Sequence, residues 1–427
     1  MDKITRKTVM PGVTLLCLQT AKFKTGYFSV SLQRQLCPEN ASKDSIIPQV
    51  LKRGCRSYPD MESLSAALDD LYGAVIEPIV RQRGEILCTG FCSSFVDDKY
   101  LPGEAKTLEN TIALVAELLL DPATKDGLLR AEYVNSEKEN ICDEIRSRVN
   151  DKRVYATGRM RETMCAGENY GTYGYGTLET AEKINYVPLT KYYKESLAES
   201  EIYMFYCGSA APERVEMAVR EAFATLPRSE ECHETGIEIR IDVDETKYVT
   251  EEMDVAQGNL AIGFRMGEVM YRPNYAAMTL FNTIYGGGVT SKLFANVREK
   301  LSLCYYASSS IDTHKGIMTV VSGIEPAKYD EALAEILAQL EACRQGDITQ
   351  KEFDSAKSYV IASLRSYNDS ASTMDDFYLG QEIKQLSYDL DEYAGLVDMV
   401  TLDDVIEIAK SIKLDTVYFL KNRGEAV

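Results

Sequence analysis

Hydrophobic and polar positions follow the same order of patterns twice along the chain. In the first half, an alternating run at 85–91 precedes an apolar helical stretch at 108–120 and a second helical stretch at 128–149. In the second half, an alternating run at 316–321 precedes helical stretches at 329–343 and 350–365. Alternation with a period of two indicates strands, and a period near 3.6 indicates amphipathic helices. The repeated order predicts two domains of similar architecture.

The fold class that these patterns predict is α+β, with the helices of each domain packed mainly on one side of a sheet. Residues 1–225 are expected to form an N-terminal domain and residues 246–427 a C-terminal domain. The stretch 226–245 between them is mostly polar and has no clear periodicity, which is typical of a linker. His233 in this stretch is expected to be a solvated loop residue.

Composition and charge narrow the classes of function. The chain of 427 residues carries 66 Asp and Glu against 47 Lys and Arg, which gives a formal net charge of −19. This balance disfavours nucleic acid or an anionic membrane as the main partner, because both select for clustered basic residues. No apolar stretch is long enough to span a bilayer, and the polar N-terminus is not typical of a signal peptide. We expect a cytoplasmic protein.

Cysteine and histidine are distributed in a way that disfavours a metal centre. The eleven cysteines are scattered without a C-x-x-C pair, and most lie in apolar runs, as expected of reduced thiols that pack in a core. The two histidines, His233 and His314, have no other candidate ligand near them in sequence. A catalytic zinc site usually needs three protein ligands. We therefore expect no metal or other cofactor in this chain.

Three segments resemble one known family. Residues 286–305 (GGGVTSKLFANVREKLSLCY) resemble the signature G-G-x-x-S-x-L-F-x-x-x-R-E-x-x-x-L-x-Y of the M16 metallopeptidases. Residues 55–73 resemble the start of that family's N-terminal domain, and residues 174–180 resemble its G-T-x-E segment. The resemblance spans nearly the whole chain and is to the M16B, mitochondrial processing peptidase-like branch. It implies two homologous domains of the LuxS/MPP-like metallohydrolase type that form one half of a clamshell.

The zinc motif of that family is degenerate in this sequence. Active members carry H-x-x-E-H, and here Ser45, Pro48 and Gln49 stand in the places of His, Glu and His. Serine and glutamine are weak zinc ligands, and proline has no side-chain base and disfavours a helix interior. We therefore expect no catalytic residue in this motif.

Two glutamates further along match another part of the family's zinc site. Glu137 and Glu144 lie seven residues apart, so on a helix they point to the same side. In the family the second glutamate of such a pair binds zinc and the first supports the site. The alternative interpretation is a solvated acidic helix face.

The family's peptide-binding edge strand also departs from the pattern. Active members usually carry Asn-Ala on the strand that pairs with the bound peptide, and Glu77 and Pro78 replace it here. Proline on an edge removes a hydrogen-bond donor from the ladder. The resemblance thus implies that the first domain lost its peptide-binding edge as well as its metal.

The second-half signature keeps the two residues that the resemblance assigns to substrate. Arg298 and Tyr305 match, residue for residue, the Arg and Tyr that bind the substrate's backbone carbonyl and stabilise the developing oxyanion in M16 peptidases. A guanidinium and a phenol are both donors that can be directed at an oxygen gaining charge. The alternative interpretation is an arginine paired with a neighbouring carboxylate and a tyrosine in the core.

The resemblance implies a non-catalytic subunit of a heterodimeric M16-type zinc peptidase. An HxxEH-bearing M16 paralogue would be the partner and would supply zinc, the general base and the water. This chain would supply Arg298 and Tyr305 to a peptide or protein substrate. The alternative is a non-enzymatic scaffold or accessory protein, for example one associated with elongation factor P modification, as in related zinc-lacking proteins of Gram-positive bacteria. An independent peptidase using another metal set is disfavoured by the missing ligands.

Overall fold

The computed structural model describes residues 3–103, 105–229 and 232–423, and its contacts divide the chain into two compact units. Each unit is built around one large β-sheet with helices packed against it, so the predicted α+β class is confirmed. The first unit contains Met1–Arg146, Thr172–Gly236 and Ala371–Gly380. The second contains Ser147–Gly171, Ile237–Ser370 and Gln381–Val427.

The sheet of the first unit has six strands in the order β1-β2-β8-β3-β5-β4, so β4 is an edge strand. Neighbouring strands are antiparallel except β2 and β8, which run parallel. The strands are β1 (Lys3–Met10), β2 (Val13–Gln19), β3 (Thr25–Gln35), β4 (Val75–Arg83), β5 (Ile86–Val96) and β8 (Glu201–Gly208). A short hairpin of β6 (Thr124–Lys125) and β7 (Leu128–Leu129) stands apart from this sheet.

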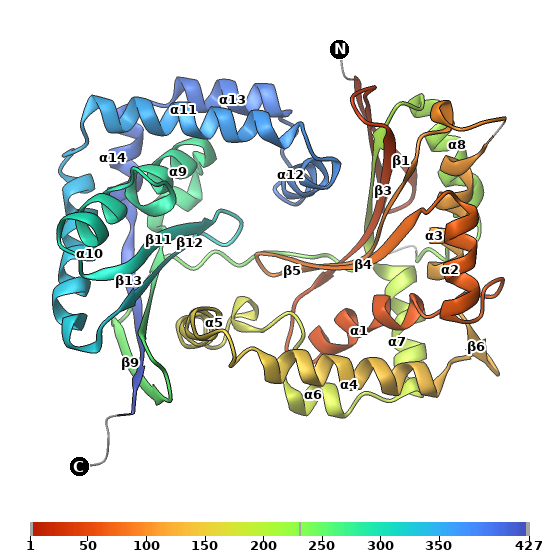
Figure 1. Ribbon diagram of the computed structural model, residues 1–427, viewed down its shortest axis with the longest axis horizontal. Coiled ribbons are helices and arrows are strands. Elements are labelled where there is room, and N and C mark those ends of the chain that lie inside the picture. The colour runs from red at the N-terminus through yellow and green to blue at the C-terminus, as the bar shows by residue number, and fades with distance from the viewer. Residues whose placement is uncertain (1–2, 104, 230–231, 424–427) are drawn as a thin grey trace. The chain divides into compact units, whose positions relative to one another are not determined.

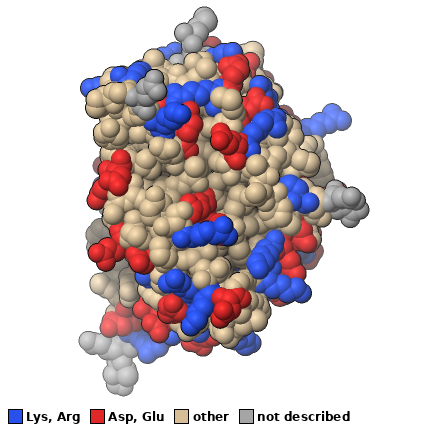
Figure 2. Space-filling model, turned by 90° about the vertical axis from the view of Figure 1, so that its right-hand side faces the viewer, with Lys and Arg blue, Asp and Glu red and all other residues tan. Residues whose placement is uncertain are grey.

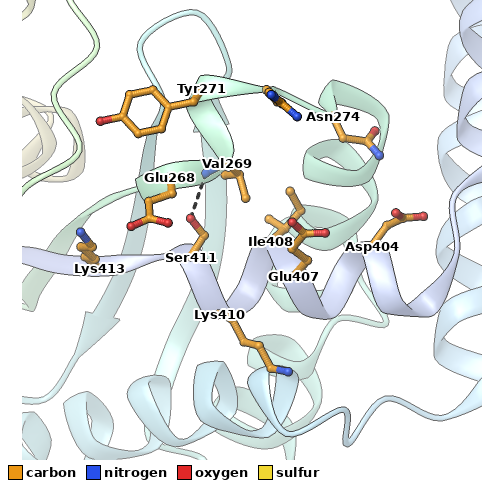
Figure 3. Close-up of a pocket in the computed structure, with 11 residues that line it drawn as sticks. Glu268, Val269, Tyr271, Asn274, Asp404, Glu407, Ile408, Lys410, Ser411 and Lys413 are labelled. Atoms are coloured by element: carbon orange, nitrogen blue, oxygen red, sulfur yellow. Dashed lines mark hydrogen bonds between the residues drawn. The ribbon is translucent and has the colours of Figure 1, made fainter.

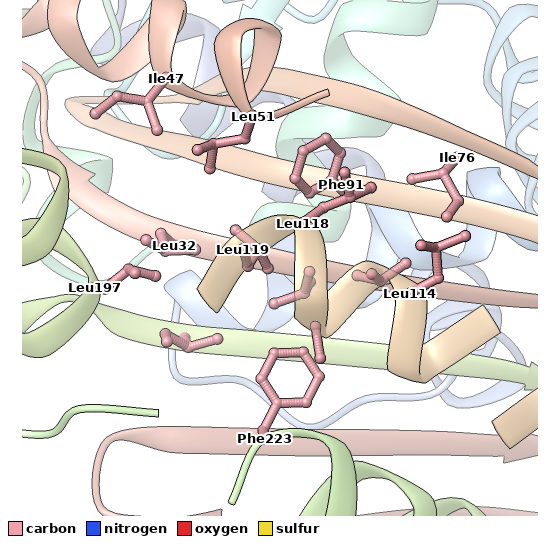
Figure 4. Close-up of a cluster of buried hydrophobic side chains, with 14 of the residues drawn as sticks. Leu32, Ile47, Leu51, Ile76, Phe91, Leu114, Leu118, Leu119, Leu197 and Phe223 are labelled. Carbon is pink, nitrogen blue, oxygen red and sulfur yellow. The ribbon is translucent and has the colours of Figure 1, made fainter. Parts of the chain in front are cut away.

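The main core of the first unit lies between one face of this sheet and a layer of helices. Alternate residues of β3, Phe28, Val30 and Leu32, are buried in one apolar cluster with Leu118 of α3 and Phe223 after α8. Figure 4 shows Leu32, Leu118 and Phe223 in this cluster. Because side chains alternate across a strand, this run of every second residue sends one face of the sheet into the core. The helices are α1 (Ala41–Leu51), α2 (Met61–Asp70), α3 (Thr107–Leu120), α4 (Ala131–Ser147), α6 (Leu178–Glu182), α7 (Tyr186–Glu199) and α8 (Pro212–Ala222).

The opposite face of the first sheet is packed against part of α12 (Ala371–Ile383), which comes from the second half of the chain (Figure 1). The buried carboxylate of Asp375 accepts hydrogen bonds from Arg81 Nη1 at 2.8 Å and from the hydroxyl of Tyr27 at 3.0 Å. The rings of Phe205 and Tyr378 stack with their centroids 6.0 Å apart. Residues distant in sequence thus complete the first unit.

The second unit has a five-stranded sheet in the order β11-β12-β10-β13-β9, antiparallel except for the parallel pair β13 and β9. Its strands are β9 (Lys247–Met253), β10 (Gly258–Arg265), β11 (Cys304–Asp312), β12 (Ile317–Ile324) and β13 (Lys413–Asn422). Its helices include η3 (Gly267–Tyr271), α9 (Tyr275–Asn282), η4 (Thr283–Gly287), η5 (Leu293–Lys300), α10 (Tyr329–Arg344), α11 (Gln350–Tyr367), α13 (Leu390–Met399) and α14 (Leu402–Ser411).

A helix from the first half of the chain packs on the second sheet. This helix, α5 (Lys152–Met164), forms a small apolar core with β10 and β13. Glu168, just after it, is buried with two cations: Arg265 Nη2 lies 2.6 Å and Lys315 Nζ 2.8 Å from its carboxylate. Asp415 lies 2.8 Å from the same guanidinium. Paired and hydrogen-bonded in this way, the buried charges hold the segment on the sheet.

The predicted repeat is matched by the elements observed in both halves. The alternating runs at 85–91 and 316–321 lie in β5 and β12, and the helical stretches that follow them form α3, α4, α10 and α11. The first residues of the stretch at 128–149 belong to β7 rather than to a helix, so α4 begins three residues later. The predicted domain boundaries were continuous ranges. They do not include the placement of α5 in the second unit and of most of α12 in the first.

The stretch predicted as a linker contains no helix or strand at its described positions 226–229 and 232–245. Its start is fixed by Arg228, whose guanidinium donates to the carbonyls of Pro11, Leu197 and Ser200 at 2.7–2.9 Å. His233 is exposed there, with Nδ1 3.3 Å from a carboxylate oxygen of Glu199. Across the described residues, no helix combines the length and apolar character needed to cross a membrane. On the face in Figure 2, basic and acidic side chains are interspersed.

Candidate functional site

The degenerate zinc motif lies on α1, and its side chains are engaged with the surrounding protein. Ser45 is fully buried, and its hydroxyl donates to the carbonyl of Gly174 at 2.6 Å. One turn earlier, the Ser42 hydroxyl donates to the carbonyl of Tyr175 at 2.8 Å. Pro48 is buried inside the helix and Gln49 is half-buried. The place of the first histidine is therefore taken by a hydrogen bond to a neighbouring loop.

That loop is the segment that resembles G-T-x-E, and its shape fits closely against α1. Gly176 has a φ of +75°, in the left-handed region that favours glycine, and a Cβ there would collide with the Ser42 hydroxyl. Thr177 then caps α6 in a capping box with Thr180. The loop covers the N-terminal half of α1, where Ser45 lies.

The two glutamates of α4 lie in different environments. Glu137 is 6% exposed, and its carboxylate accepts hydrogen bonds from Arg53 Nε and, at 3.0 Å, from Asn140 Nδ2. Glu144 is exposed, and it lies close enough to Tyr175 that, after burial, its charge raises the pKa of that phenol. Glu144 is thus exposed, whereas Glu137 is buried and paired.

The donor set at this place does not fit zinc. A tetrahedral zinc site needs thiolate, imidazole or carboxylate ligands with free lone pairs. Here the serine oxygen donates its proton to a carbonyl, proline offers no donor, and Glu137 is neutralised by a guanidinium. Within the described ranges, no three His, Cys, Asp or Glu side chains come together as a metal site. We derive no chemistry from a metal in this unit.

A buried carboxylate next to the motif was not singled out in the sequence. Asp44 on α1 is 2% exposed, and its Oδ1 accepts a hydrogen bond from the Tyr192 hydroxyl at 2.8 Å. Arg34 Nε is 4.0 Å away. Burial raises the pKa of Asp44 to about 6, against the lowering effect of Arg34 and Tyr192. The signal in the sequence that could have indicated Asp44 was an acidic residue within a helical run that is otherwise buried.

The edge strand β4 lacks two of the hydrogen-bonding groups that a further strand could use. Pro78 pairs with Phe91 of β5 and has no N–H to donate. Two residues earlier, the carbonyl of Ile76 accepts a hydrogen bond from Lys52 Nζ. Backbone groups two residues apart in a strand point to the same side. A proline is tolerated in a paired strand when its nitrogen points away from the partner, so both groups lie on the open edge.

The segment that carries the Arg/Tyr signature begins at a close approach of backbone to backbone. Gly286 is the last buried residue of η4. A Cβ atom at this position would lie 2.6 Å from the hydroxyl oxygen and 2.8 Å from the backbone nitrogen of Ser309. The glycine is required by this contact with β11, since its φ is not positive. Just before the following segment, the Ser291 hydroxyl accepts from the Phe294 N–H at 3.3 Å.

Three backbone irregularities follow within this segment. The residues of η5 are wound as a π-helix, which is rare and often found at functional sites. Ser302 has a φ of +50°, an uncommon conformation for a non-glycine residue. The pairing of β11 with β12 is then interrupted between Cys304 and Tyr306, so Tyr305 is the extra residue of a β-bulge. Bulges redirect side chains, often beside active sites.

These irregularities bring Arg298 and Tyr305 together at the surface of the second unit. Both line a hollow of about 370 Å³, with Glu299, Glu325 and Lys328. Tyr305 is 64% exposed, so the alternative of a core tyrosine is wrong. Arg298 is 42% exposed in its side chain; its guanidinium stacks 4.7 Å from the Phe294 ring centroid and its Nε is 3.6 Å from Glu299. The two donors predicted to act together line the same hollow, while their role in substrate binding stays a prediction.

A larger hollow of about 600 Å³ lies elsewhere in the second unit, between η3 and α14 (Figure 3). The backbone N–H of Val269 donates to the Ser411 hydroxyl at 3.1 Å and joins its two walls. Its lining mixes acidic and basic side chains and includes none of the residues predicted as site residues. The lining residues with charge are Glu268, Arg272, Asp404, Glu407, Lys410 and Lys413.

Comparisons with known proteins agree with this fold. Residues 183–360 match the family model described as Peptidase M16 inactive domain. The chain is 30% identical over 413 residues to the probable inactive metalloprotease YmfF of Bacillus subtilis, with 96% of each chain covered. A conserved protein from Enterococcus faecalis has a solved structure with a TM-score of 0.90 at 28% identity, covering 99% of this chain and 100% of that one.

A solved M16 inactive domain from Pseudomonas fluorescens shares the fold, with a TM-score of 0.80 at 15% identity and coverage of 99% and 98%. Together with the relative in Bacillus subtilis, which is matched along nearly its entire length, these likenesses account for both halves of the chain. The chain belongs to the M16 metallopeptidase family.

Proposed function

We propose that this chain is the non-catalytic subunit of a heterodimeric M16 peptidase and contributes Arg298 and Tyr305 to peptide substrate bound with a catalytic partner. The observation that supports this most is the bulge that turns Tyr305 toward solvent beside Arg298, in one hollow. Backbone conformations of this uncommon kind cost energy, and they cluster at active sites and ligand-binding sites.

The partner in this proposal is an M16 chain that carries H-x-x-E-H. Zinc, the general base and the activated water belong to that chain. The substrate's carbonyl oxygen gains negative charge during attack, and a guanidinium and a phenol can each donate to it. The filled motif on α1 supports the division of roles, since it offers no metal site, and so do the two hydrogen-bonding groups that edge β4 lacks for a peptide at Ile76 and Pro78.

The proposal places the complex in the cytoplasm. All eleven cysteines are free thiols in this structure, and most of them are buried. Free thiols at this number are expected in a reducing compartment.

The test is to produce the chain with an H-x-x-E-H paralogue from the same genome and to follow cleavage of a quenched-fluorescent peptide library. Losing one oxyanion donor costs on the order of 10²–10³ in kcat, so Arg298→Ala and Tyr305→Phe should slow cleavage strongly without dissolving the complex. Arg272→Ala, an exposed arginine in the other hollow of the same unit, is the matched control. Unchanged turnover in both variants would remove the proposal.

The scaffold alternative is an outcome of the same experiment. If the chain forms no complex with the paralogue, or if the complex forms and cleaves no peptide, the hollow has no catalytic partner. A non-enzymatic accessory role then describes the chain better.

A further inference from the structure

An ion pair between a buried lysine and a partly exposed glutamate lies beside the Arg/Tyr segment but outside its hollow. Lys292 directly precedes η5 and its side chain is 7% exposed, with Nζ 3.2 Å from Oε1 of Glu352 on α11. A lysine is seldom buried unless it is paired, because removing an ammonium group from water is costly. Lys292 stands at the start of η5, the segment that carries Arg298. This position suggests a link between the ion pair and the conformation of η5.

The carboxylate that receives Lys292 is itself fixed. Glu352 occupies the third position of α11, where its Oε2 accepts from the N–H and the hydroxyl of Thr349, both at 2.7 Å. Burial would raise the pKa of Glu352, but these hydrogen bonds and Lys292 lower it below its ordinary value. Lys292 is thus attached to an ionised group at a rigid helix N-terminus.

A second polar tie lies one turn further along η5. Asn296 Nδ2 donates to Gln339 Oε1 of α10 at 2.9 Å and to the carbonyl of Lys292 at 3.1 Å. Leu293 and Val297, next to these residues, are fully buried. These polar and apolar contacts fix part of η5 to the unit, whereas the side chain of Arg298 is exposed.

The Lys292–Glu352 ion pair and the Asn296 hydrogen bonds can account for the π-helical winding of η5. A π-helix is rare and is normally seen as single turns inside α-helices, so eight residues of it need tertiary contacts that fix the winding. If the segment rewound as an α-helix, Arg298 would turn relative to Leu293 and Val297 and away from its place beside Tyr305. Two buried aliphatic side chains alone do not specify one winding, whereas hydrogen bonds and an ion pair have defined partners.

We propose that the Lys292–Glu352 ion pair is a positioning contact that holds η5 in the winding which places Arg298 beside Tyr305. Its consequence for catalysis rests on the proposed function, while its effect on the segment is a property of this chain alone.

The test is hydrogen exchange of the full chain, followed by mass spectrometry. Lys292→Met keeps the side chain's length and removes its charge, and Glu352→Gln keeps a capping residue and removes the carboxylate. Both should raise amide exchange in 294–305 by about tenfold, because local opening sets the exchange rate of a folded segment. Lys351→Met, an exposed lysine beside Glu352, is the matched control and should change nothing in this segment. Lys292→Arg should restore most of the protection.

Unchanged exchange in 294–305 in both variants would overturn the proposal. A rise spread evenly over the chain in Glu352→Gln would also overturn it, because that result describes general destabilisation. In the assembled peptidase, both variants should lower kcat with little change in KM, and less than Arg298→Ala does. If Arg298→Ala leaves turnover unchanged while the exchange result holds, the proposed function fails and the positioning contact stands.

Discussion

The degenerate motif on α1 and the Arg/Tyr segment of the second unit differ in how their side chains are used. On α1, Ser45 is buried and bonded to a neighbouring loop, and Glu137 is neutralised by Arg53. In the second unit, Arg298 and Tyr305 face solvent, and the backbone around them departs from regular helix and strand. The degenerate motif, which lacks the zinc ligands, is part of the ordinary packing of its unit. The Arg/Tyr segment is exposed and keeps an unusual backbone geometry.

The strongest way to break this comparison is to restore the zinc motif. The triple change Ser45→His, Pro48→Glu and Gln49→His puts an imidazole and a carboxylate into fully buried positions. Overpacking alone costs about 1–3 kcal/mol per site, so we expect a loss of several kcal/mol and no zinc bound. Urea unfolding and metal analysis after dialysis check this result. Stoichiometric zinc in a folded variant would show that the site is dormant rather than filled.

Removing the cation that neutralises Glu137 has a smaller expected effect. Arg53→Ala leaves a buried carboxylate without its ion-pair partner, and because Arg53 is partly exposed we expect a loss of about 1–3 kcal/mol. Arg56→Ala is the matched control, since its pair with Asp121 is largely exposed and should cost under about 1 kcal/mol. Equal midpoints of urea unfolding for the two variants would contradict the assignment of a buried, neutralised glutamate.

The pH dependence of stability sharpens the description of α1. The pKa of Asp44 is raised to about 6 in the folded chain, so Asp44 favours folding below the carboxyl's ordinary pKa and loses that contribution as pH rises toward 6. Asp44→Asn removes this loss. The difference in unfolding free energy between variant and parent should shift in favour of the variant by on the order of 1–2 kcal/mol between about pH 4 and pH 7.

Urea unfolding at several pH values measures this difference. Asp121→Asn is a suitable control, because that carboxylate is exposed and its pair with Arg56 lies at the surface. A shift toward the parent with rising pH would mean that Asp44 is stabilised as an anion, which contradicts the effect of its burial.

Local patterns were enough to predict most of the architecture. The order of strands and helices in both halves follows from hydrophobic periodicity, because each element buries one face and its residues repeat with that element's own period. The loss of the zinc ligands was also visible, since it depends on residue type alone.

The contacts of the degenerate motif on α1 and the exposure of Arg298 and Tyr305 depend on residues that are distant in sequence. The partner of Glu137 is Arg53, 84 residues away, and the partner of Ser45 is a carbonyl 129 residues away. Similarly, no local pattern predicts that α5 and α12 each pack on the sheet of the other half. Such pairings follow from the fold as a whole, since many residues of each type could have served.

The sequence by itself determined that the chain has two similar halves, lacks zinc ligands at 45–49 and keeps an arginine and a tyrosine in a signature at 298 and 305. The tertiary structure alone decided that the first place is packed shut and the second is exposed. The physical reason is that residue identity fixes what chemistry a side chain can perform, whereas burial, bulges and π-helical winding arise from long-range packing that a linear pattern does not record.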